Sequence, residues 1–128
     1  MSIHVKSLDH LVLTVSNIKK SVDFYTRILG MNKVQFGNDR VALSFGNQKI
    51  NLHESGKEFE PKAKYPTEGS ADLCFVIDTN LIEAKQKLKN LGVLIESGPV
   101  ERTGAKGKIK SLYIRDPDFN LIELSNYF

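Results

Sequence analysis

The chain repeats one arrangement of apolar segments, and this repeat limits its fold more than any other feature. An apolar, β-branched run at 9–15 ends in turn residues, and a run of the same character follows at 71–77. His10 in the first run corresponds to Asp72 in the second, an offset of 72 − 10 = 62 residues. A helical pattern ending at Gly30 returns with its end at Gly92, and 92 − 30 is again 62. Unrelated apolar segments rarely keep one register across a strand and a helix, so we predict two copies of one unit.

Each predicted helix is preceded by one strand and followed by three strand-like segments. The helices have apolar faces made of Ile18, Val22, Tyr25, Ile28 and Leu29 in the first half and of Leu81, Ala84, Leu88 and Leu91 in the second. The later strands are predicted at 33–36, 41–45 and 49–53, and at 94–96, 110–115 and 120–125. The order is therefore βαβββ twice, in modules 1–66 and 67–128 of a single α+β domain. We expect two curved mixed sheets whose inner faces enclose a shared cavity, with the helices outside.

Composition narrows the class of protein. With 41% hydrophobic and 26% charged residues, the chain is typical of a soluble globular protein. We expect a cytoplasmic protein, because no apolar run approaches the length of a membrane span and the N-terminus lacks the apolar core of a signal peptide. The net charge of +3 comes without a dense basic run, which disfavours a nucleic-acid partner.

Polar side chains interrupt the apolar strands at repeat-related positions. Alternation along the strands puts His10 on the inner face of the first half and Glu123 on that of the second. Asn51 and His53 lie on the first-half strand that corresponds to the strand of Glu123, and Asp72 is the second copy of His10. An ionised carboxylate among apolar residues is costly unless something compensates its charge. We therefore favour a metal bound by His10 and Glu123 over a hydrogen-bonded core histidine.

The further ligands stay open at this point. Asn51 aligns better with Glu123, whereas His53 is the stronger ligand type. Asp72 could bind the metal, act as a base beside it, or face water at the start of a strand. Cys74 lies on the same inferred face, where a small buried thiol is the usual interpretation.

A glycine-rich basic segment at 97–108 is predicted to be a loop. Arg102, Lys106 and Lys108 in this region make it positively charged, so it could close as a lid over an anionic substrate. The alternative is a solvated loop without a function. Together with Tyr113 and Arg115 on the following strand, these residues are the predicted substrate-binding set.

Several stretches make the chain similar to the vicinal oxygen chelate superfamily, which includes glyoxalase I, fosfomycin-resistance proteins, extradiol dioxygenases, methylmalonyl-CoA epimerase and bleomycin-resistance proteins. They are LDHLVLTV, SVDFYTRILGM, KINLH, ADLCFVI and RDPDFNLIELS. The resemblance implies a glyoxalase-like fold and metal ligands at His10 and Glu123, with others from positions like Asn51 or His53 and Asp72. It also implies a homodimer.

Two residues depart from the pattern of the superfamily. Many members carry a histidine where this chain has Asp72, which makes the site richer in oxygen and disfavours the ferrous chemistry of dioxygenases. Many also carry a glycine where this chain has Phe119, a poor residue for a turn that needs positive φ.

The resemblance and the residues together favour a metal-dependent enzyme of the glyoxalase I (lactoylglutathione lyase) type. A divalent ion such as Ni, Zn, Mn or Fe would act as a Lewis acid on a small anionic or vicinal-oxygen substrate, and Glu123 or Asp72 would move the proton. A thiol such as glutathione is a candidate cofactor. The alternatives are epoxide opening of the fosfomycin type and a metal-free binding protein of the bleomycin-resistance type. The basic charge of the chain disfavours the binding of a cationic drug.

Overall fold

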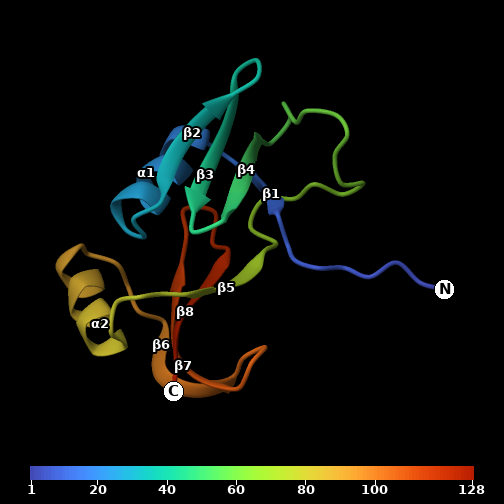
Figure 1. Ribbon diagram of the computed structural model, residues 1–128. Helices are drawn as coiled ribbons and strands as arrows, with labels where there is room; N and C mark the ends of the chain where they lie inside the picture. Colours follow the sequence, from blue (N-terminus) through green and yellow to red (C-terminus); the bar gives the residue numbers. More distant parts are fainter. The chain divides into compact units, whose positions relative to one another are not determined.

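The computed structural model describes residues 1–128, which divide into two compact units, Met1–Glu68 and Gly69–Phe128 (Figure 1). Unit 1 contains β1 (His10–Val15), α1 (Ile18–Arg27), β2 (Asn32–Phe36), β3 (Arg40–Phe45) and β4 (Gln48–Glu54). Unit 2 contains β5 (Asp72–Val76), α2 (Leu81–Asn90), β6 (Ser97–Thr103), β7 (Lys108–Arg115) and β8 (Leu121–Tyr127). The predicted α+β class with two βαβββ modules is confirmed.

Both units have the same sheet topology. The strand order is β1-β4-β3-β2 in unit 1 and β5-β8-β7-β6 in unit 2. The strand β1 runs parallel to β4, and β5 runs parallel to β8. The other neighbouring strands are antiparallel. A parallel pair needs a long crossover, and the helix and the two intervening strands supply it. No helix of the chain is long and apolar enough to cross a membrane.

Each helix packs on one face of its own sheet and leaves the other face for polar side chains. The helix α1 contacts β2, β3 and β4, and α2 contacts β7 and β8. The buried residues that form these two cores include Leu13, Val15, Leu43, Ile50 and Leu52 in unit 1 and Leu88, Leu112, Ile114, Ile122 and Leu124 in unit 2. The side chains of Asn17 and Asn80 cap the two helices by accepting from the backbone N–H groups of Lys20 and Ile82.

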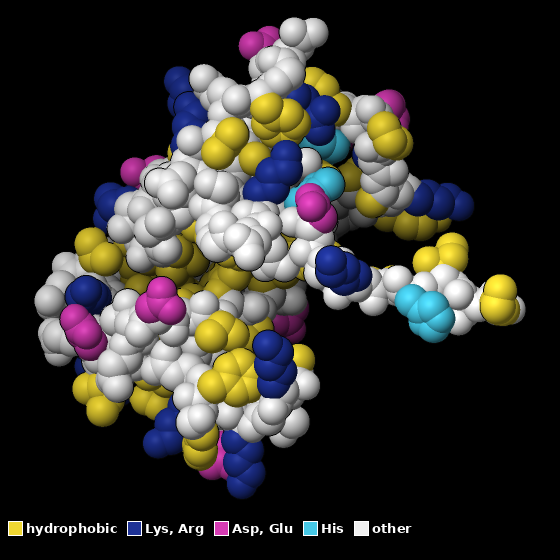
Figure 2. Space-filling model, in the orientation of Figure 1, with side chains coloured by type: hydrophobic (Ala, Val, Ile, Leu, Met, Phe, Trp, Pro, Cys, Tyr) yellow, Lys and Arg dark blue, Asp and Glu magenta, His cyan; other side chains and the backbone are white.

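The N-terminal segment 1–9 forms neither helix nor strand. Its apolar side chains are exposed, with Ile3 at 93% and Val5 at 89% (Figure 2). The backbone carbonyl of Leu8 accepts from the side chain of Gln48 at 2.9 Å, which ties the end of this segment to β4.

Most of the segment predicted as a basic loop at 97–108 belongs to a β-hairpin, so the prediction of a loop was wrong. Within it, 97–103 form β6, 104–107 form the turn, and β7 begins at Lys108. The predicted strand at 94–96 was also wrong, because β6 begins at Ser97. The pairing of β6 with β7 shifts register between Ser97 and Val100. A Cβ atom at Gly98 would collide with the backbone carbonyl oxygen of Ser111. The glycine therefore allows close strand approach here, a need that local sequence does not reveal.

The turn before β8 requires the positive φ that the sequence left in doubt. Phe119 has φ 67°, and 74% of its surface is exposed. Replacing Phe119 by glycine should raise the free energy of unfolding by about 1 kcal/mol relative to Phe119→Ala, because both changes remove the ring and only glycine removes the Cβ penalty. Urea denaturation of the two variants measures the difference. Equal stability of the two would show that the left-handed backbone carries no cost here.

Candidate functional site

The polar residues predicted in unit 1 share the face of the sheet that lies opposite α1. In the parallel pairing of β1 and β4, His10 is level with Lys49, Val12 with Asn51 and Thr14 with His53. Level residues of neighbouring strands point to the same side, so His10, Asn51 and His53 face one way. Measured along the strands, Asn51 lies about 7 Å beyond the level of His10, and His53 about 13 Å beyond it. The register therefore makes Asn51 the nearer partner of His10.

One nitrogen of His10 is already engaged. Its Nδ1 lies 2.8 Å from Oδ1 of Asp9, and the side chain of His10 is 43% exposed. With the proton on Nδ1, the imidazole donates to Asp9 and keeps a lone pair on Nε2. Histidines that bind metals commonly donate their other N–H to a carboxylate in this way.

Two buried polar atoms on the same face have no hydrogen-bond partner. They are Oδ1 of Asn51 and Nε2 of His53, in residues that are 6% and 2% exposed. Burial lowers the pKa of His53 below its ordinary value, and the positive charge of Arg40 acts in the same direction. The imidazole of His53 is therefore neutral at neutral pH. Because buried polar atoms are nearly always hydrogen-bonded, these two atoms indicate positions where a ligand or ion would bind.

In unit 2, Glu123 belongs to a chain of hydrogen bonds. The hydroxyl of Ser111 donates to Oε2 of Glu123 at 2.6 Å and lies 2.7 Å from the hydroxyl of Ser125. Since Ser111 gives its only proton to the carboxylate, Ser125 donates to Ser111, and the thiol of Cys74 can donate to Ser125 at 3.3 Å. The carboxylate of Glu123 thus has a partner in its own sheet. Sequence reasoning missed Ser111, although its even spacing from Tyr113 and Arg115 would have placed it on this face.

Cys74 and Asp72 lie on the same face as Glu123, as predicted, because the parallel register pairs Cys74 with Glu123 and Asp72 with Leu121. Cys74 is exposed, so the expectation of a buried thiol was wrong. Partial desolvation nevertheless raises the pKa of the Cys74 thiol, and the hydrogen bond between Cys74 and Ser125 opposes this only in part. The thiol therefore stays protonated at neutral pH. Asp72 is exposed at the first position of β5.

Part of the predicted substrate-binding set shares the face of Glu123. The antiparallel register of β7 and β8 puts Tyr113 level with Glu123 and Arg115 level with Leu121. Arg102 donates from Nε to the Tyr113 hydroxyl at 3.0 Å. Arg115 is engaged differently, since it forms two 3.0 Å hydrogen bonds to the carboxylate of Glu96.

The two lysines of that set are elsewhere in the hairpin. Lys108 begins β7 one residue before Ile109, whose side chain shares the face of Glu123, so Lys108 points to the opposite side. Its ammonium pairs with Glu101 at 3.3 Å. Lys106 lies in the turn, where its backbone N–H donates to the hydroxyl of Tyr127 at 3.1 Å.

Each unit contributes part of the predicted ligand set. Unit 1 carries His10, Asn51 and His53, and unit 2 carries Glu123 and Asp72. Within either unit alone, no three His, Cys, Asp or Glu side chains could hold a metal ion.

The sequence of the chain matches a known family. The sequence profile of the Glyoxalase/Bleomycin resistance protein/Dioxygenase superfamily matches residues 7–124. The chain belongs to this superfamily.

Relatives with high identity extend over almost the whole chain. The glyoxalase domain-containing protein RDO1 of Mycosarcoma maydis is 60% identical over 123 residues, which make up 96% of this chain and 69% of that protein. The crystal structure of virulence protein STM3117 from Salmonella typhimurium is 53% identical, with a TM-score of 0.97 over 98% of this chain and 100% of that chain. An integron cassette protein from the mobile metagenome of V. cholerae is 55% identical, with a TM-score of 0.97 and complete coverage of both chains.

Proposed function

We propose that the chain is a metal-dependent enzyme that acts on a small molecule in the manner of glyoxalase I. The observation that carries this proposal is that His10 and Glu123 each form a hydrogen bond with a neighbouring side chain at one side-chain atom. Asp9 holds Nδ1 of His10, and Ser111 holds Oε2 of Glu123. These two hydrogen bonds orient the side chains and do not involve Nε2 of His10 or Oε1 of Glu123, which are the atoms proposed to bind the metal. Metal-binding side chains are commonly oriented by such hydrogen bonds. The proposed ligands are His10 and Glu123, with Asn51 and Asp72.

The donor set fits a divalent cation. The unpaired Oδ1 of Asn51 is an amide oxygen of the kind that divalent ions accept as a ligand, and its burial makes the missing partner costly. His53 is left out of the proposed set because the register puts it about 13 Å beyond the level of His10 along the strands. A bound divalent ion would supply Lewis-acid chemistry to two adjacent substrate oxygens.

The side chains of unit 2 suit proton transfer. Ser111 fixes one oxygen of Glu123, which orients the other oxygen to accept a proton from the substrate. Asp72 is the alternative base, since it is exposed on the same face. Arg102, which hydrogen-bonds to Tyr113 on this face, is the proposed contact for an anionic substrate.

Calorimetric titration of chelator-treated protein with nickel, zinc, manganese and ferrous ions tests the proposal. We expect one ion to bind per chain, and the loaded protein to isomerise the glutathione adduct of an α-ketoaldehyde. Turnover of an epoxide phosphonate instead would assign the fosfomycin-type reaction to the same site. The absence of binding by all of these ions would contradict metal catalysis.

One observation favours a second function, that of a metal-free binding protein. The hydrogen bond from Ser111 to Glu123 offsets part of the cost of desolvating the carboxylate, and it does so without a cation. Such a protein would bind an organic ligand equally well before and after treatment with chelator. The homodimer expected from the family resemblance is part of both proposals, and analytical ultracentrifugation would test it.

A further inference from the structure

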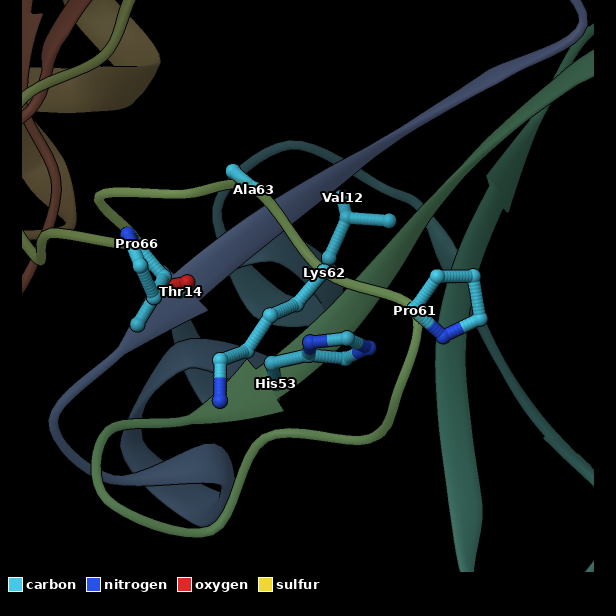
Figure 3. A pocket seen from close by; sticks show the side chains of 7 residues that line it. All are labelled: Val12, Thr14, His53, Pro61, Lys62, Ala63 and Pro66. Carbon is cyan, nitrogen blue, oxygen red and sulfur yellow. The ribbon is translucent and has the colours of Figure 1, made fainter.

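Unit 1 contains a pocket that the proposed metal site does not use. It has a volume of about 240 Å³ and lies between the ends of β1 and β4 and the segment 55–68, which contains no helix or strand (Figure 3). Its polar side chains come from three different places, Thr14 on β1, His53 on β4 and Lys62 on the segment. Its apolar lining includes Val12, Pro61 and Pro66. Figure 3 shows these side chains arranged around one space.

His53 gives the pocket an unsatisfied polar group. The residue is 2% exposed, and its Nε2 has no hydrogen-bond partner. Phe59 packs against the imidazole with ring centroids 5.7 Å apart and an interplanar angle of 68°, which holds the ring in place. A buried imidazole that borders a pocket and whose Nε2 lacks a partner points to a ligand group at this position.

Lys62 is the only charged side chain that lines the pocket. Its ammonium lies 3.1 Å from Oε1 of Glu60, and the side chains of Lys62 and Glu60 are 35% and 72% exposed. An ion pair with so exposed a carboxylate is weak, and an ammonium has three donors. Lys62 can therefore bind a second anion while it keeps its contact with Glu60.

We propose that this pocket binds a short-chain carboxylic acid, with the carboxylate at Lys62 and Thr14 and the hydrocarbon against Val12, Pro61 and Pro66. A single lining cation matches a single negative charge, whereas a phosphate group would need more donors. The volume of about 240 Å³ is below the usual range for drug-sized ligands, which favours a small ligand. Nε2 of His53, which is buried and has no partner, forms a hydrogen bond with a further polar atom of the ligand. The site goes beyond the proposed function, because it requires no metal.

Nuclear magnetic resonance titration of the chelator-treated full chain tests this site. The probes are a series of short-chain carboxylates and the corresponding primary amides. We expect saturable shifts confined to the residues that line the pocket, with each carboxylate binding at least about tenfold more tightly than its amide, because the amide loses the charge-assisted hydrogen bond. Equal affinity of carboxylates and amides, or no saturable shift with any carboxylate, would overturn the proposal.

A pair of variants assigns the binding to Lys62. Lys62→Met should weaken carboxylate binding by about tenfold or more. Lys64→Met is the matched control and should leave the affinity unchanged, because Lys64 lies on the same segment, 5.5 Å from the centre of the Tyr65 ring, and does not line the pocket. Equal weakening in both variants would mean that only the general charge of the segment attracts the anion. Because this titration contains no metal, its result is independent of the outcome of the metal titration.

Discussion

Glu123→Gln should lower the affinity of the chain for divalent cations by about a hundredfold or more, because it removes an anionic ligand and keeps the shape of the side chain. The amide oxygen of glutamine can still accept the hydrogen bond from Ser111, so the variant should fold normally. Catalytic turnover by the metal-loaded protein should fall at least as far. Calorimetry on chelator-treated protein measures the affinity, and circular dichroism checks the fold.

Glu101→Gln is the matched control for this experiment. Glu101 lies on β6, in the same sheet as Glu123, but its carboxylate is exposed and pairs with Lys108 at 3.3 Å. We expect the metal affinity of the Glu101→Gln variant to equal that of the unmodified chain. If both variants lose the same affinity, the ions bind through general surface charge and Glu123 is no ligand.

Asp116→Ala should lower the free energy of unfolding by about 3 kcal/mol, because several buried donors lose one acceptor together. Asp116 is only 4% exposed. Its Oδ1 accepts from the backbone N–H groups of Asp118 at 2.9 Å and Asn120 at 3.0 Å. Its Oδ2 accepts from the side-chain amide of Asn120 at 2.8 Å. Urea denaturation measures the loss.

The effect of Asp116→Ala should also reach the strands that carry the candidate site residues of unit 2. The side-chain oxygen of Asn120 accepts from the backbone N–H of Ala71 at 2.8 Å, next to the start of β5, while β8 begins at Leu121. Hydrogen exchange should therefore increase at both strands. Asp23→Ala is the control, since its contact with Arg27 at 3.4 Å is an exposed pair that contributes less than about 0.5 kcal/mol. Equal losses in the two variants would show that the Asp116 network adds no stability.

Local patterns predicted most elements because each pattern has a local cause. Alternation of side chains along a strand put His10, Asn51 and His53 on one face, and the strand register confirms this. The glycines that follow the two helices have φ 70° at Gly30 and 76° at Gly92, the conformation expected just beyond a helix end. Both expectations needed only the order of nearby residues.

The hairpin of β6 and β7 shows where local patterns fail. Glycines at 98, 104 and 107 and a proline at 99 are typical of a loop, and the segment was predicted accordingly. Pairing with β7 instead makes most of it a strand, with a register shift near Gly98. Phe119 is a similar case, because turn geometry rather than residue preference determines its positive φ.

The sequence by itself determined the repeated βαβββ units and the sheet face of the candidate residues His10, Asn51, His53 and Glu123, because side-chain periodicity is a property of the local backbone. Only the tertiary structure decided which side chains meet across strands. The strand register places Asn51 nearer than His53 to the level of His10. Glu123 accepts a hydrogen bond from Ser111, which is 12 residues away along the chain. The physical reason is that neighbours across a sheet depend on strand register, and register results from the packing of the whole unit.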